Sequence, residues 1–169
     1  MAVFAERIAL WVEAASVYRD RRVLLITLLG VSSGFPLGIL GDPLSAVLIL
    51  NGMSKETIGY FGLLGIPYAV KFLWAPILDR FRLPLLTRLL GRRRGWIVAM
   101  QIALMCAIGT LSGVDFAREI LAAALITFAI AFFSASQDIV IDAYRVEILE
   151  ERQLGAGAAT VVLGYRFGQ

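Results

Sequence analysis

Long apolar runs with very few charges are the feature that most limits what this chain can fold into. The runs cover residues 23–50, 57–78, 95–114, 120–142 and 154–169, and the third of them contains no charged residue at all. A helix needs about 20 apolar residues to cross the hydrocarbon core of a bilayer. The pattern therefore predicts a bundle of four complete transmembrane helices and an incomplete fifth.

Composition excludes a soluble domain. Hydrophobic residues make up 59% of the 169 residues and charged residues only 17%, so a soluble fold of this size would leave large apolar patches exposed. The basic residues form short clusters between the runs, and no binding surface of basic and aromatic residues can be recognised among them, which argues against nucleic-acid binding. We expect an all-α membrane protein whose partner is the lipid bilayer.

Residues 1–22 differ from a secretory signal peptide, because they carry several charges and lack a small-residue cleavage site. Their apolar side chains recur at the spacing of one helix face: Phe4, Ile8, Trp11, Val12 and Ala15. This spacing predicts a cytoplasmic amphipathic segment on the membrane surface, followed by the transmembrane bundle over residues 23–169. A disordered leader is the alternative.

The loops on one side of the predicted bundle hold most of the basic residues. These are Arg7, Arg19, Arg21, Arg22, Arg80, Arg82, Arg88, Arg92, Arg93, Arg94, Arg145 and Arg152. The loops on the other side hold only Lys55 and Arg118. By the positive-inside rule, the N-terminus and the loop 79–95 are expected to be cytoplasmic, while the loops 52–56 and 115–119 face outward.

No motif of a soluble enzyme is present. The chain has no histidine, and its one cysteine, Cys106, lies within a predicted helix, which excludes a Cys/His metal site or catalytic pair. The glycines of run 154–169 match no phosphate-binding loop, because the lysine and the following hydroxyl are missing, so we interpret them as helix-packing residues. An intramembrane aspartyl protease needs two aspartates on facing helices, whereas Asp138 and Asp142 share one. We therefore expect neither an enzyme nor a bound cofactor or metal.

Charges inside the apolar runs are costly, and they usually mark ion or substrate paths. Asp138 and Asp142 are four residues apart and share a helix face, with Gln137 alongside and Arg145 one turn further on. Two neighbouring carboxylates in a low dielectric disfavour double ionisation, so they form a candidate proton-coupling pair. Alternatively, Asp142 pairs with Arg145 at a helix end while Asp138 bonds to a neighbouring helix.

Three further charged residues are candidates for contact with substrate or for pairing with these carboxylates. Lys71 lies within run 57–78, where it could pair with Asp138, receive an anionic substrate, or extend its ammonium to the membrane surface. Arg166 lies at a similar depth in the last run, and the same alternatives apply to it. Asp42 could line a cavity or simply precede Pro43 in a loop.

Several stretches resemble one known family. They are residues 57–65 (TIGYFGLLG), 71–80 (KFLWAPILDR), 91–96 (GRRRGW) and 134–143 (SASQDIVIDA), with smaller contributions from 155–159 and 163–166. In this order and at this spacing, they resemble the AmpG-like muropeptide permeases of the major facilitator superfamily. The resemblance implies a major facilitator-type helical bundle, of which this chain would supply most of one half.

The resemblance also implies a function. Such permeases are proton-coupled importers of anhydromuropeptides, the sugar and peptide fragments of peptidoglycan, across the bacterial inner membrane for cell-wall recycling. The coupling ion would be the proton, and no protein partner is indicated. Asp79, Arg80, Arg92 and Arg93 would belong to a charged gating loop that locks the inward side in one state. A merely solvated basic loop is the competing interpretation.

Other functions stay open at this point. The acetyl-coenzyme A transporters share a Gln-Asp motif on the equivalent helix, and their substrate is also anionic, so Lys71 and Arg166 do not separate the two substrates. The Asp42-Pro43 pair departs from the small uncharged residues that the permease family has there. A non-transporting membrane fragment or subunit is the remaining alternative.

Overall fold

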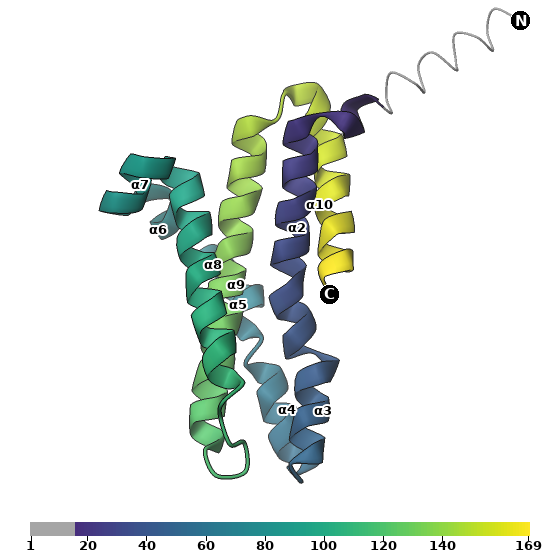
Figure 1. Ribbon diagram of the computed structural model, residues 1–169, viewed down its shortest axis with the longest axis vertical. Coiled ribbons are helices and arrows are strands. Elements are labelled where there is room, and N and C mark those ends of the chain that lie inside the picture. Colours follow the sequence, from purple (N-terminus) through teal and green to yellow (C-terminus); the bar gives the residue numbers. More distant parts are fainter. Residues whose placement is uncertain (1–15) are drawn as a thin grey trace, which may run out of the picture.

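The computed structural model describes residues 16–169, and over these residues the chain is a bundle of helices without strands (Figure 1). This confirms the expected all-α fold. The surface segment expected over residues 1–22 lies mostly outside the described residues. What is described of it is a short 3-10 helix, η1 (Val17–Arg19), and the beginning of α2.

The first span consists of α2 (Arg21–Leu40) and α3 (Asp42–Leu50), which meet at Gly41. Asp20 caps α2, because its carboxylate accepts a hydrogen bond of 2.7 Å from the backbone nitrogen of Arg22. Together the two helices form a 30-residue stretch that is long and apolar enough to cross a membrane.

The stretch predicted as a transmembrane helix over 57–78, called the second span below, is not one continuous helix. It consists of four short pieces: α4 (Lys55–Leu63), α5 (Ile66–Val70), the 3-10 helix η2 (Lys71–Leu73) and α6 (Ala75–Arg80). Pro67 and Pro76 stand at the N-terminal positions of α5 and α6. A proline has no backbone N–H and disfavours the helical conformation of the residue before it, so each one begins a new helix.

The rest of the chain forms α7 (Pro84–Leu90), α8 (Arg92–Leu111), α9 (Ile120–Ile148), the 3-10 helix η3 (Glu151–Gln153) and α10 (Leu154–Gly168). Of these, α8 and α9 are long and apolar enough to cross a membrane. The helix expected over 120–142 continues to Ile148, because the polar residues after Asp142 extend it beyond the apolar run. Its last turns therefore stand at the end of the bundle that carries most arginines.

Helices α2 and α10 lie side by side and run in the same direction (Figure 1). A Cβ added at Gly30 or Gly34 would come within 3.0 Å of a carbonyl oxygen of α10, and one added at Gly38 would come as close to the backbone oxygen of Gln169, just after α10. Gly164 stands equally close to the backbone of α2. These glycines let the two backbones approach closely, as small residues do between membrane helices. The packing role expected for the glycines of run 154–169 thus holds for Gly164, whereas Gly155 faces open space.

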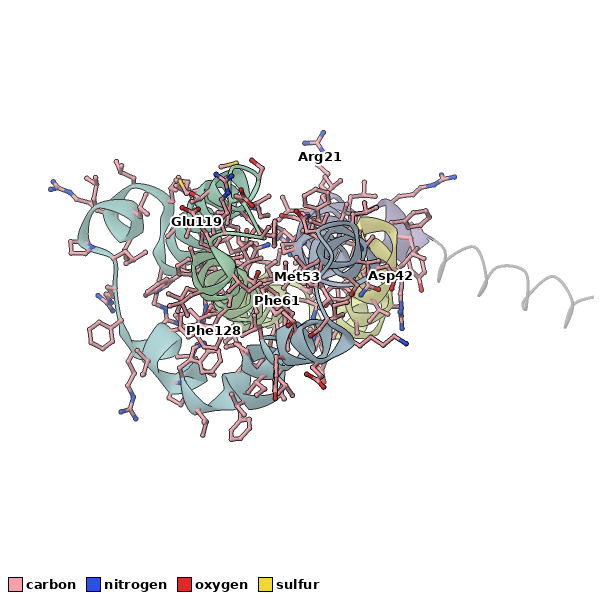
Figure 2. The ribbon with its side chains drawn as sticks, turned by 90° about the horizontal axis from the view of Figure 1, so that it is seen from below. Arg21, Asp42, Met53, Phe61, Glu119 and Phe128 are labelled. Atoms are coloured by element: carbon pink, nitrogen blue, oxygen red, sulfur yellow. The ribbon has the colours of Figure 1, made fainter. Side chains whose placement is uncertain are left out.

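The interior has two apolar clusters, one at each end of the bundle. The cluster at the arginine-rich end consists of Val23, Ile26, Leu78, Ile97, Val140, Ile141, Tyr144 and Leu149. The other consists of Leu44, Leu48, Phe61, Leu104, Leu111, Phe116, Ala123 and Ile130. Figure 2, seen along the bundle, shows Phe61 near its middle and Arg21 at its edge. On α2, α8 and α9 the residues between these clusters include serines, glutamines and one aspartate, and this polar layer contains the candidate site.

Candidate functional site

The polar layer joins three helices through hydrogen bonds. Gln101 of α8 donates from Nε2 to the hydroxyl of Ser32 on α2, at 2.9 Å. Gln137 of α9 donates to the same hydroxyl at 3.4 Å and is 1% exposed. Polar groups at membrane depth need such partners, because no solvent is present to satisfy them. Gln137, a predicted substrate-site residue, therefore lies in the interior and joins α9 to α2.

Asp138, the next residue, carries the main charge of the layer. Its Oδ1 accepts a hydrogen bond from the hydroxyl of Ser33, and its Oδ2 lies 3.3 Å from Nζ of Lys71. The Asp138 side chain is 12% exposed and that of Lys71 is 34% exposed. A charge this deep is tolerated when it is both paired and hydrogen-bonded. Among the alternatives for Lys71, the structure shows the pair with Asp138.

The break in the second span positions Lys71. The lysine begins the 3-10 helix η2, and Trp74 just after it donates from Nε1 to the hydroxyl of Ser136, at 3.0 Å. The Trp74 ring also packs on Phe132, with ring centroids 4.9 Å apart. Both contacts hold η2 against α9, so the ammonium of Lys71 reaches the carboxylate of Asp138.

A hollow of about 450 Å³ opens beside this pair, between α2, η2, α9 and α10. It is lined by Gly30, Ser33, Leu37, Lys71, Asp138, Ile141, Asp142, Val161, Val162, Tyr165, Arg166 and Gln169. The structure thus brings together four residues predicted from the sequence, two cationic and two anionic, in a hollow with no net charge. We call it the central hollow.

The other two charges of the central hollow are less enclosed. The side chain of Asp142 is 58% exposed, and its carboxylate lies 3.5 Å from Nη2 of Arg145. Asp142 therefore forms the ion pair with Arg145 that was the alternative to a proton-coupling role. Arg166 donates to the side chain of Gln169 at 3.3 Å. Asp142 and Arg166 are therefore more accessible than Asp138.

Asp42 lies apart from the other predicted residues. It occupies the first turn of α3 and lines a separate hollow of about 410 Å³, together with Gly41 and Pro43. An acidic residue in the first turn of a helix is stabilised by the helix dipole. The structure does not bring Asp42 together with Lys71 or Asp138.

The predicted gating residues form a compact network at the arginine-rich end. Arg93 lies 2.5 Å from Asp79 and 2.7 Å from Glu147, and its side chain is 11% exposed. Arg92 donates to the backbone oxygen of Asp79 at 2.6 Å and lies 3.5 Å from Glu147. The network ties α6, α8 and α9 together. Arg80 has no ion pair or side-chain hydrogen bond in the described part of the chain.

Sequence reasoning missed Ser33, Tyr68 and Glu147. A serine in an apolar run resembles a packing residue, so nothing singled out Ser33. The hydroxyl of Tyr68 is buried near Asp138, but one tyrosine in a run gives no signal of this. Glu147 lies beyond residue 142, where the apolar run that predicts its helix ends.

Within residues 16–169, the structure has no metal-binding cluster, and its one cysteine is free. Within residues 16–169, no group of three or more Cys, Asp or Glu side chains is arranged to hold a metal ion. Cys106 is free and exposed on α8, away from the central hollow. The charged groups that line the central hollow are two carboxylates, one ammonium and one guanidinium.

Comparison with known proteins gives the family. A family model described as "Acetyl-coenzyme A transporter 1" matches residues 22–169. The chain belongs to this family. No solved structure matches it significantly.

Two relatives refine the comparison. The chain is 40% identical over 152 residues to a protein of Escherichia coli K12 named anhydromuropeptide permease. The matching region covers 90% of this chain and 30% of that protein. The chain is 36% identical over 149 residues to a putative transporter AmpG 1 of Rickettsia bellii, covering 88% of this chain and 36% of the relative. The chain thus spans about a third of the length of these relatives.

These findings confirm the resemblance to the AmpG-like permeases. The relatives are named permeases or transporters, and none of the names cited above describes an enzyme. Together with the apolar helices, they indicate a multi-pass membrane protein.

Proposed function

We propose that this chain forms part of a proton-coupled permease that imports anhydromuropeptides across the bacterial inner membrane for the recycling of peptidoglycan. The printed name of the Escherichia coli relative supports the substrate class. The observation that carries the mechanism is the pair of Lys71 and Asp138, 3.3 Å apart on the wall of the central hollow.

The carboxylate of Asp138 and a carboxylate of the substrate compete for the ammonium of Lys71. The ionised carboxylate of Asp138 holds the ammonium of Lys71 and accepts the hydroxyl of Ser33. A proton on Asp138 removes its charge, so Lys71 is released to bind a carboxylate of the substrate. Loss of the proton restores the pair and displaces that carboxylate. Coupling then follows from the different affinity of the two protonation states for substrate.

The charge balance of the central hollow favours a peptide-containing substrate over acetyl-coenzyme A. The lining of this hollow has two cationic side chains, Lys71 and Arg166, and two anionic ones, Asp138 and Asp142. Several phosphate groups, as in coenzyme A, call for a surplus of arginine or lysine. A sugar-peptide fragment with carboxylates and polar groups needs no such surplus. Acetyl-coenzyme A transport, to which the family description points, is the second candidate.

The distribution of arginines supports an N-terminus in the cytoplasm. Arg22 at the start of α2 contacts Ile148 at the end of α9, so the basic ends of these helices lie together. The opposite end carries Lys55 and Arg118. By the positive-inside rule the arginine-rich end faces the cytoplasm. There the network of Asp79, Arg93 and their neighbours would act as the gate on the inward side.

Uptake measurements test the proposed function. A chimera of the Escherichia coli permease that carries this chain in place of the matching residues is reconstituted in vesicles, with labelled anhydromuropeptide or acetyl-coenzyme A outside. We expect muropeptide uptake driven by a proton gradient, lost in Asp138→Asn and kept in the exposed-loop control Asp115→Asn. A rate of uptake that changes neither with the proton gradient nor in Asp138→Asn would contradict proton coupling. Preference for acetyl-coenzyme A would establish the second candidate, and a folded but inactive chimera would favour a non-transporting membrane component.

A further inference from the structure

A further hollow, separate from the central hollow and from the one at Asp42, lies at the arginine-rich end of the bundle. It has a volume of about 430 Å³ and is lined by Arg21, Arg22, Leu25, Arg94, Tyr144, Glu147 and Ile148. The start of α2, the first turn of α8 and the last turns of α9 contribute these residues. Three guanidinium groups face one carboxylate, so this basic hollow carries a net positive charge, whereas the central hollow is balanced.

Arg94 is held in place with most of its hydrogen-bonding capacity unused. Its Nε donates to the hydroxyl of Tyr144 at 2.9 Å, and its guanidinium carbon lies 5.7 Å from the centre of that ring. Tyr144 is 6% exposed and belongs to the adjacent apolar cluster. The two terminal nitrogens of Arg94 have no acceptor among residues 16–169. A guanidinium fixed in this way presents a pair of donors to an incoming anion.

The other arginines of the basic hollow add donors. Arg21 makes no side-chain hydrogen bond or ion pair in the part of the chain that the structure describes, and it extends from the edge of the bundle (Figure 2). Arg22 makes only long contacts, 3.4 Å to the backbone oxygen of Ile148 and 3.6 Å to Glu150. The basic hollow therefore has several N–H groups without an acceptor. Its one carboxylate, that of Glu147, is paired with Arg92 and Arg93 instead.

Part of the lining of the basic hollow is apolar. It includes Leu25 of α2, which is 41% exposed, and Ile148 of α9. Leu28, one turn further along α2 toward the middle of the span, is 68% exposed. A soluble anion such as phosphate would leave these apolar groups without a partner. An amphiphile with an anionic head and a hydrocarbon chain matches both parts.

We propose that the basic hollow binds an anionic phospholipid, with the phosphate at Arg21 and Arg94 and an acyl chain along Leu25 and Leu28. The hollow stands where a span that begins at Arg21 leaves the hydrocarbon core, which is the depth of lipid phosphates. Basic hollows between membrane helices are suited to anionic head groups. The positive-inside rule alone requires arginines on this side but neither a hollow nor an oriented guanidinium.

Lipid titration of the purified protein, followed by native mass spectrometry, tests this site. We expect tighter binding of phosphatidylglycerol than of phosphatidylcholine. Arg21→Gln and Arg94→Gln should each weaken phosphatidylglycerol binding about fivefold, because one arginine near a lipid phosphate is worth about 1 kcal/mol. Arg88→Gln, which removes an arginine of α7 outside the basic hollow, is the matched control and should leave the affinity unchanged.

Three results would overturn the proposal. These are equal weakening by Arg88→Gln, no preference for the anionic lipid, and inorganic phosphate binding as tightly as the lipid with the same sensitivity to Arg94→Gln, which would identify a site for soluble anions. If Arg94→Gln fails to fold, Arg21→Gln decides the outcome, because Arg21 has no side-chain contact to lose. None of these measurements depends on the transported substrate, so the site can fail or hold independently of the proposed function.

Discussion

Asp138 has two side-chain partners, and they stabilise its charge in different ways. Ser33 donates one hydrogen bond from α2, while Lys71 supplies the counter-charge from η2. Both partners come from segments far from Asp138 in the sequence. The carboxylate therefore joins α2, the second span and α9, and its protonation would loosen contacts among all three.

The Lys71–Asp138 pair can be tested by a double-mutant cycle. Lys71→Gln leaves a largely buried carboxylate without its counter-charge, and we expect it to lower the free energy of unfolding by about 1–3 kcal/mol. Adding Asp138→Asn removes the unpaired charge, so the double variant should recover part of that loss. Thermal unfolding in detergent gives the energies. Additive effects of the two substitutions would contradict a direct pair.

Asp20 offers a test outside the membrane-spanning segments. The hydrogen bond from the Arg22 backbone, and then that from Gln153 Nε2 at 2.8 Å, hold the pKa of Asp20 below its ordinary value of 3.8. A carboxyl whose folded-state pKa is lowered stabilises the fold above its unfolded pKa, and this contribution is lost as the pH falls through the lower, folded value.

We therefore expect the unfolding temperature to fall below about pH 4 by more in the natural chain than in Asp20→Asn. The asparagine keeps a cap for α2 but does not titrate, so the two proteins should converge in stability at the lowest pH. Unfolding temperatures measured between about pH 6 and pH 2 test this. Parallel curves over the whole range would show that Asp20 contributes no pH dependence.

At the scale of the elements, the closest contact in the bundle is that between α2 and α10. A methyl group at Gly34 would meet the backbone of Tyr165, whereas a methyl group at Gly59 of α4 would meet nothing within 4 Å. The same substitution should then have opposite effects at these two helical positions.

We expect Gly34→Ala to lower the free energy of unfolding by about 1–3 kcal/mol, because the helices must separate. Gly59→Ala should raise it by about 0.5–1 kcal/mol, because alanine loses less conformational entropy in a helix. Thermal unfolding of the two variants under identical conditions gives the comparison. If Gly34→Ala stabilised the protein as much as Gly59→Ala, the close approach of α2 and α10 would be refuted.

The elements also show what a sequence can predict. Hydrophobic runs located α8 and α9, because a span of apolar residues leaves few alternatives to a helix in a bilayer. They did not predict the breaks at Gly65 and Trp74, since proline in membrane helices is often tolerated without a new helix start. Asp138 stood out as a charge in an apolar run. Its partner Ser33 did not, because which faces of α2 and α9 meet is decided by packing over the whole bundle.

At the scale of the whole molecule, the charged network of α6, α8 and α9 stands at the arginine-rich mouth of the bundle, beyond the central hollow. Arg93 bridges Asp79 and Glu147, so one guanidinium ties the second span to both neighbouring helices. If this network is a gate, its strength sets how often the central hollow opens toward that side.

A cysteine placed in the central hollow would report that opening. Val162 lines the hollow and is 58% exposed, so Val162→Cys in a Cys106→Ser background can be labelled by a membrane-impermeant thiol reagent from the arginine-rich side. Glu147→Gln removes one of the two anions that hold Arg93, and we expect labelling to become several-fold faster. Glu119→Gln, which removes a carboxylate at the opposite end of the bundle, should leave the rate unchanged. Equal labelling rates in the two variants would mean that the network only stabilises the fold. Faster labelling in Glu147→Gln alone would mean that the network controls access to Asp138 and Lys71.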